Sequence, residues 1–137
     1  MAAGHPDVRL FRRLAEERLG DAEYLLAGDR PRGAAYLGGY AAECVLKALI
    51  LAATPRGREA AVTAGFRGLA AHDLSRLARQ YRAAGGAPAP EEVRRDLARL
   101  SVWEVGLRYD MTAALPGDVR AFLDAAGRLI AWASGRL

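Results

Sequence analysis

Residues 36–50 (YLGGYAAECVLKALI) constrain the fold of this 137-residue chain more than any other segment. They read as one helix that is apolar on nearly every side, and such a helix needs neighbours on several sides. Yet Glu43 and Lys47 lie one turn apart on it, and Lys47 is the only lysine in the sequence. The polar stripe formed by Tyr36, Tyr40, Glu43 and Lys47 therefore requires a partner, a ligand or water.

The remaining segments predict further helices. Ala, Leu, Arg and Glu dominate the chain and favour helix, and no run of alternating Val, Ile and Thr supports a strand. Apolar residues at spacings of three and four predict helices over about 7–26, 32–53, 73–83, 91–107 and 118–134, with a short helix over 59–64. We expect one all-α domain over residues 1–137, an antiparallel up-and-down bundle of four main helices with a short extra helix.

Several single residues refine this expectation. Asp7, Asp29 and Asp73 stand where N-caps of the first three long helices are expected. The pair Gly38-Gly39 lies within a helix, where each glycine weakens the helix by about 1 kcal/mol relative to alanine, so another element is expected to pack closely there.

Composition excludes some classes of function. The net charge of +4 and the pI of about 9.7 permit an acidic partner such as a nucleotide, RNA or an acidic protein surface, without requiring one. With two histidines and one cysteine far apart in the sequence, we expect no metal site, and Cys44 reads as a small core residue. No phosphate-binding loop or dinucleotide fingerprint is present, so no cofactor is expected.

The compartment is also predicted from what the sequence lacks. No run of about 20 uninterrupted apolar residues is present to span a membrane. The first residues lack a basic region followed by an apolar core, as a signal peptide would have. A cytoplasmic protein without a membrane partner is expected.

The Glu43–Lys47 pair has two interpretations. It is either a solvent-facing ion pair at positions i and i+4, worth about 0.3–0.5 kcal/mol, or part of a cleft between helices or subunits. In the cleft, Lys47 would meet an anion while Glu43 held it in place, and Tyr36 and Tyr40 would supply flat faces and hydroxyl groups.

Two other candidates stand outside the stripe. Arg108, followed by Tyr109, either bonds the last carbonyls of its own helix or points into a groove for phosphate or RNA. His72 beside Asp73 reads as a structural residue that ties a loop to a helix start, and less readily as a catalytic one. Asp96 reads as part of a solvated helix face.

These motifs together resemble the HEPN domain. The resemblance rests on the motif AxYLxxYAAECxLKAL in the second helix, on His72-Asp73-Leu74, on Arg108-Tyr109 and on the final amphipathic helix. It implies a four-helix bundle that is commonly a homodimer and often pairs with a small nucleotidyltransferase in a toxin–antitoxin module. It also implies, for some members, metal-independent RNase activity from an arginine followed four to six residues later by a histidine.

This chain departs from that RNase pattern, because no histidine follows Arg108. The side chain best matched to proton transfer near neutral pH is therefore missing. We predict a dimeric, non-catalytic HEPN-type protein that binds a nucleotide-like or anionic ligand and acts with a nucleotidyltransferase. The alternative is a divergent RNase toxin that uses Arg108 with Tyr109, Asp110 or His72. The predicted ligand-binding residues are Tyr36, Tyr40, Glu43, Lys47, Arg108 and Tyr109.

Overall fold

The computed structural model describes residues 5–67, 72–109 and 115–137, and only the backbone of residues 102–109. The described residues form six α-helices and no strand, which confirms the all-α prediction. Four helices have 19 to 23 residues, and the other two are shorter. The helices are α1 Pro6–Ala27, α2 Pro31–Ala53, α3 Glu59–Ala64, α4 Leu74–Ala83, α5 Glu91–Tyr109 and α6 Pro116–Ser134.

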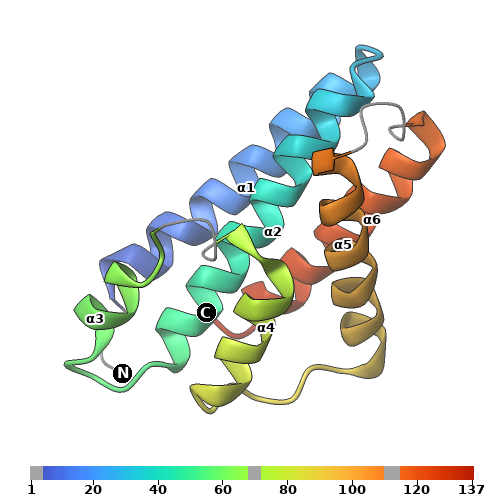
Figure 1. Cartoon of the computed structure of the whole chain (residues 1–137). Coiled ribbons are helices and arrows are strands. Elements are labelled where there is room, and N and C mark those ends of the chain that lie inside the picture. Colours follow the sequence, from blue (N-terminus) through green and yellow to red (C-terminus); the bar gives the residue numbers. More distant parts are fainter. Residues whose placement is uncertain (1–4, 68–71, 110–114) are drawn as a thin grey trace.

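The four long helices α1, α2, α5 and α6 run alternately up and down, as predicted (Figure 1). Helix α2 is the centre of the arrangement and contacts each of the other five helices. α1 lies along one side of α2, and α4 and α6 pack against other sides. The apolar circumference of α2 is therefore explained by neighbours around it.

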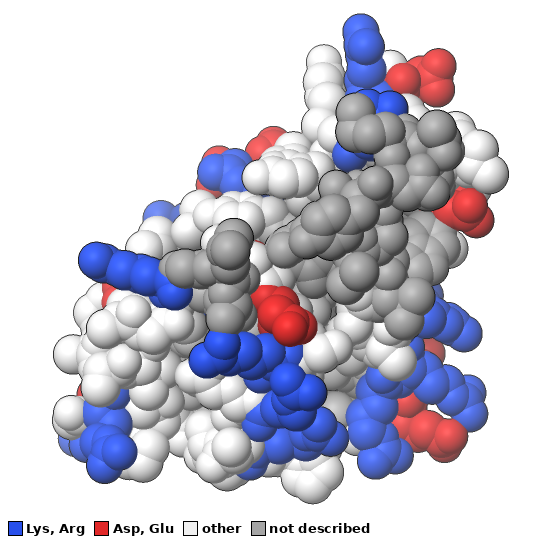
Figure 2. All heavy atoms as spheres, in the orientation of Figure 1, with Lys and Arg blue, Asp and Glu red and all other residues white. Residues whose placement is uncertain are grey.

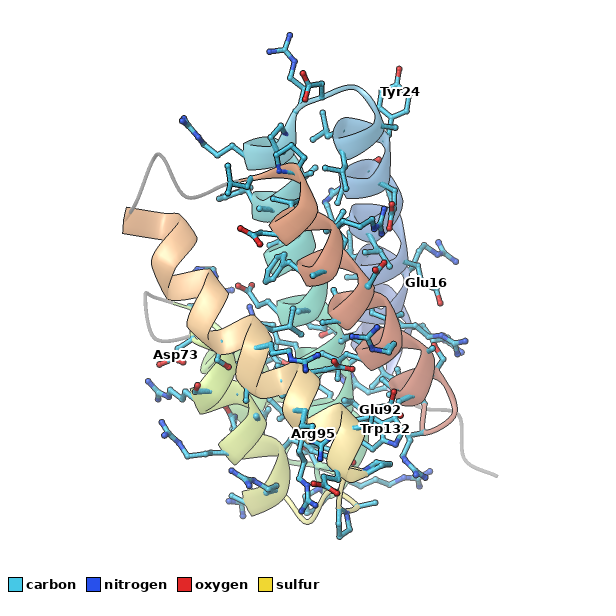
Figure 3. All side chains as sticks on the ribbon, turned by 90° about the vertical axis from the view of Figure 1, so that its right-hand side faces the viewer. Glu16, Tyr24, Asp73, Glu92, Arg95 and Trp132 are labelled. Atoms are coloured by element: carbon cyan, nitrogen blue, oxygen red, sulfur yellow. The ribbon has the colours of Figure 1, made fainter. Side chains whose placement is uncertain are left out.

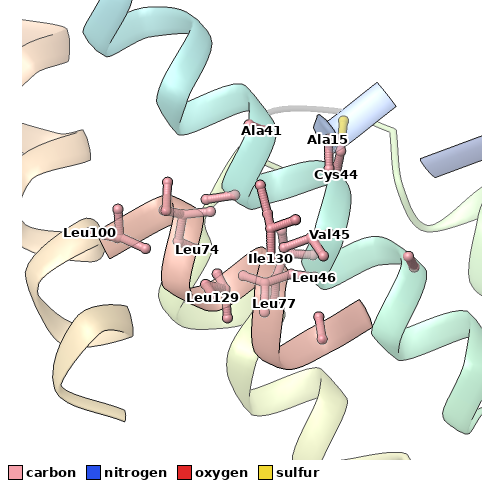
Figure 4. Packing of buried hydrophobic residues seen from close by; sticks show 14 of the residues in the cluster. Ala15, Ala41, Cys44, Val45, Leu46, Leu74, Leu77, Leu100, Leu129 and Ile130 are labelled. Atoms are coloured by element: carbon pink, nitrogen blue, oxygen red, sulfur yellow. The ribbon is translucent and has the colours of Figure 1, made fainter. Parts of the chain in front are cut away.

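The core forms where α2, α4, α5 and α6 meet (Figure 4). Leu46 of α2, Leu77 of α4, Leu100 of α5 and Leu129 of α6 are all at most 1% exposed. Cys44 is buried in the same cluster, as its apolar surroundings in the sequence predict.

The Gly38-Gly39 pair lies where α2 meets α6. A β-carbon added to Gly38 would overlap Leu123 Cδ2 and lie 3.2 Å from the Phe122 ring. A β-carbon on Gly39 would lie 3.7 Å from Phe122, an ordinary van der Waals distance. The predicted close approach of another helix is therefore confirmed, but it requires a glycine only at position 38.

Two predicted helix caps are wrong. Helix α1 is capped by the His5 ring, whose Nδ1 accepts the Asp7 N–H at 3.2 Å, because Pro6 already occupies the first helical position. Asp29 does not cap α2. It has φ 59°, and the N–H of Arg30 bonds the carbonyl of Leu25 at 2.8 Å, so Asp29 occupies the left-handed position that ends α1.

The cap predicted at Asp73 is confirmed, since its side chain accepts the Arg76 N–H at 3.2 Å. The predicted helix boundaries hold to within two residues. The largest shifts are at the end of α5, Tyr109, and at the start of α6, Pro116.

By length and composition alone, helix α2 could cross a membrane, although Glu43 and Lys47 interrupt its apolar run. However, 78% of its apolar window is buried inside the bundle. This burial accounts for the composition of α2 as that of a core helix.

Candidate functional site

The polar stripe on α2 contains a buried charged cluster. Lys47 Nζ donates to Glu43 Oε2 at 2.9 Å, and His72 Nδ1 lies 2.7 Å from Glu43 Oε1. The Glu43 and Lys47 side chains are only 5% and 7% exposed. The interpretation of the pair as a solvent-facing one is therefore wrong, because both charges lie inside the bundle.

The segment after α3 covers this cluster. Lys47 Nζ lies 5.4 Å from the centre of the Phe66 ring, close enough for a cation–π contact. Phe66 is 9% exposed and packs edge-on against Phe11 of α1, with ring centres 5.8 Å apart. Glu43 and Phe66 therefore contact the Lys47 ammonium, and Phe11 supports the Phe66 ring from α1.

His72 joins the start of α4 to the middle of α2. Its side chain is 44% exposed, while the carboxylate it contacts is almost fully buried. The histidine thus lies at the boundary between Glu43 and solvent. It contacts the middle of α2, whereas the sequence suggests a contact with the helix start beside it.

The other half of the stripe is exposed. Tyr36 is 77% exposed and Tyr40 is 37% exposed. Arg32, one turn before Tyr36, is also exposed, and the Arg18 guanidinium of α1 lies 5.9 Å from the centre of the Tyr40 ring. We call Arg18, Arg32, Tyr36 and Tyr40 the tyrosine face. This face places cations beside flat aromatic rings. The sequence does not predict the contact between Arg18 and Tyr40, because Arg18 comes from another helix.

The titration of the groups next to Glu43 limits their chemistry. Burial, followed by the negative charge of Glu43, raises the pKa of the Cys44 thiol to about 11. The pKa of the Tyr40 hydroxyl is also raised, first by Cys44 and then by burial and Glu43. Near neutral pH, both groups are therefore protonated and cannot serve as nucleophile or base.

A second ion pair, in which the carboxylate is buried and the guanidinium is 44% exposed, contradicts the expectation that Asp96 is solvated. Asp96 is 1% exposed, and Arg128 of α6 donates to both of its carboxylate oxygens at 2.9 Å. The sequence carried a signal for this burial, since Asp96 lies three residues after Val93 and four before Leu100 on the inner stripe of α5. The pair holds α5 against α6.

The remaining predicted site residues are not placed. The side chains of Arg108 and Tyr109 lie outside the described residues, and so does Asp110. Within the described part of the chain, no group of three or more His, Cys, Asp or Glu side chains is arranged to hold a metal ion.

Comparison with known proteins identifies the fold. The family model of the HEPN domain matches residues 8–136 of the chain. The chain is also similar to the crystal structure of ST0689, an archaeal HEPN homologue, with a TM-score of 0.64 and 19% sequence identity. That match covers 93% of this chain and 95% of the other. No curated protein matches the chain.

Proposed function

This chain belongs to the HEPN domain family, and from that membership we propose that it is a non-catalytic binding protein of one domain. In this proposal it forms a homodimer, binds a nucleotide-like or anionic ligand on the tyrosine face, and acts with a nucleotidyltransferase partner. The observation that carries the proposal is the exposure of Tyr36 and Tyr40 beside Arg18 and Arg32.

The chemistry of the tyrosine face suits such a ligand. An exposed tyrosine ring gives a nucleobase a surface on which to stack, worth about 1–3 kcal/mol per base. A guanidinium beside it supplies charge-assisted hydrogen bonds to phosphate. Arg18 is bonded to Asp21 at 3.1 Å, but that pair is exposed, and exposed pairs contribute only about 0.2–1 kcal/mol. A phosphate can therefore compete for Arg18.

The buried half of the stripe has a supporting role in this proposal. Glu43 already contacts both Lys47 and His72, and Phe66 contacts the ammonium. These contacts fix the middle of α2 and the segment that covers it. We propose that Glu43 and Lys47 hold the surface next to Tyr40 in shape, rather than contacting the ligand first.

The histidines favour binding over RNA cleavage. The sequence contains only His5 and His72, both before Arg108. Nδ1 of His5 caps α1, and Nδ1 of His72 lies against Glu43. Both rings thus have structural contacts, which supports the proposal that neither acts as the general acid or base of an RNase.

Calorimetric titration tests the ligand. We expect ATP or a short single-stranded RNA to bind the wild-type protein, and the double variant Tyr36→Ala/Tyr40→Ala to bind at least about tenfold more weakly, as expected from lost stacking. Tyr24→Ala is the matched control, because Tyr24 is 81% exposed but lies on α1, outside the tyrosine face. Equal affinity of the double variant and the wild type would refute the tyrosine face as the site.

Two further measurements test the remaining parts of the proposal. Sedimentation velocity should show a dimer. The proposal also predicts that a small nucleotidyltransferase is encoded beside this gene and that adding it gives a faster-sedimenting complex. In parallel, labelled RNA is incubated with wild type and with Arg108→Ala. Cleavage by the wild type that disappears in Arg108→Ala would overturn the non-catalytic proposal in favour of the RNase alternative.

A further inference from the structure

A groove lies on the other side of the bundle from the contacts of α1. It has a volume of about 330 Å³ and is formed between α4 and α5, with α2 beneath it and the end of α6 at its edge. Leu46 and Leu49 of α2 and Leu97 of α5 line it. This volume falls at the lower end of the range of small-molecule sites, and its apolar lining is typical of them.

Three arginines line the same groove. They are Arg79 and Arg82 of α4 and Arg94 of α5. Within the described part of the chain, none of the three has an acidic side chain within ion-pair distance, whereas Arg95 next to them is bonded to Glu91 at 2.8 Å. Figure 2 shows the positive side chains gathered over α4.

Trp132 forms part of the groove wall. It lines the groove from α6, beside the N-terminal half of α5 (Figure 3). Its indole Nε1–H is buried and has no hydrogen-bond partner among the described residues. Since that nitrogen is closed off from solvent, Trp132 can meet a ligand in the groove only through the part of its ring that lines the groove.

The wall of the groove is held by its neighbours. The Tyr81 ring of α4 packs edge-on against Trp132, with ring centres 6.3 Å apart. Gly86 lets the loop after α4 pass over Tyr81, since a β-carbon there would overlap the Tyr81 ring. The position of Trp132 is therefore set by packing, and the groove does not need a bound molecule to form.

We propose that this groove is a second binding site, for a small molecule with an aromatic body and a phosphate or carboxylate at one end. The aromatic body would pack on Leu97 and the Trp132 ring, which are partly exposed, and the anion would meet Arg79, Arg82 and Arg94. The assignment needs both features. The arginines alone would suit any small anion, and the apolar lining alone would suit an uncharged apolar molecule. The site is separate from the tyrosine face and does not depend on the function proposed for that face.

Titration with 1-naphthyl phosphate, followed by the indole N–H signals in ¹⁵N NMR spectra, tests the proposal. The chain has two tryptophans, and the variant Trp103→Phe assigns the Trp132 signal. We expect the Trp132 signal to shift on saturation. We also expect 1-naphthol, which lacks the anion, and inorganic phosphate, which lacks the aromatic body, each to bind at least about tenfold more weakly.

Arginine variants then locate the anion. Arg79→Gln/Arg82→Gln should weaken binding of 1-naphthyl phosphate by about tenfold or more, whereas Arg76→Gln should leave it unchanged. Arg76 is the matched control, since it is exposed on the same helix and does not line the groove. Tyr36→Ala/Tyr40→Ala should also leave it unchanged, so that failure of one site is distinguished from failure of the other. A silent Trp132 signal, or equal affinity across the arginine variants, would overturn the proposal.

Discussion

Removing the Lys47 amine tests whether the buried contact between Lys47 and Glu43 contributes to the free energy of unfolding as a buried ion pair should. In Lys47→Met the side chain keeps a flexible apolar stem beside Phe66 but leaves the Glu43 carboxylate, 5% exposed, without its 2.9 Å partner. Breaking a buried ion pair by removing one member costs about 3–5 kcal/mol, and the 2.7 Å contact that His72 keeps with Glu43 Oε1 places the expected loss toward the lower figure. For a chain of this length, that loss lowers the melting temperature by about 10–20 °C.

The measurement is urea unfolding followed by circular dichroism, with thermal melts as a second readout. The chain offers a matched control in Arg12 and Glu16, an i,i+4 pair on α1 whose side chains are 41% and 52% exposed. Arg12→Met should change the free energy of unfolding by less than about 1 kcal/mol. The contrast between the two variants isolates the effect of burial, because the helical spacing is the same.

The double variant Glu43→Leu/Lys47→Met separates charge from packing. With both charges gone, no uncompensated group is left inside, and we expect stability within about 1 kcal/mol of the wild type. His72 can then turn to water, as its side chain is already 44% exposed. If Lys47→Met costs no more than Arg12→Met, or if the double variant is as unstable as the single one, the reasoning from burial is refuted.

Two further predictions follow from the packing of α2. Gly39→Ala should stabilise the protein by about 1 kcal/mol through helix propensity. Gly38→Ala should be less stable than Gly39→Ala by about 1–3 kcal/mol, because its β-carbon would overlap Leu123. Equal stability of the two variants in urea unfolding would contradict the α2–α6 contact. Since the pKa of Cys44 is raised from 9.0 to about 11, the native thiol should react with a disulfide reagent at pH 8 at least about 100-fold more slowly than the thiol of the unfolded chain. The protonated thiol favours the folded state, and this contribution to the free energy of unfolding should be lost as the pH rises from 9 toward 11.

Apolar periodicity predicted the helices because their burial follows from local spacing. The same rule placed Val93 and Leu100 on the inner stripe of α5, but Asp96 was assigned to solvent by residue type rather than by position. Its partner, Arg128, is 32 residues away, and no local pattern links the two. Spacing therefore predicts which positions are buried, while the partner of a buried charge depends on the tertiary arrangement.

The burial of the stripe on α2 also could not be predicted from local spacing. Tyr36, Tyr40, Glu43 and Lys47 share one side of the helix, and the sequence gives no sign that the stripe changes from exposed to buried after Tyr40. Phe66 and His72 contact the buried part of the stripe, and Phe66 comes from a short segment with two glycines and weak helical signal. Predicting the change would require the path of that segment, which long-range packing determines.

Two ion pairs with buried carboxylates, Glu43–Lys47 and Asp96–Arg128, lie within the bundle. Pairs of this kind contribute little net stability compared with apolar residues of the same size, so their effect is on which faces can meet. Through His72, the Glu43 cluster fixes the start of α4 against α2, and the Asp96–Arg128 pair fixes α5 against α6. Those contacts add to the apolar packing that positions α4, α5 and α6 around the groove. The tyrosine face, made by α1 and α2, rests instead on the contact between those two helices.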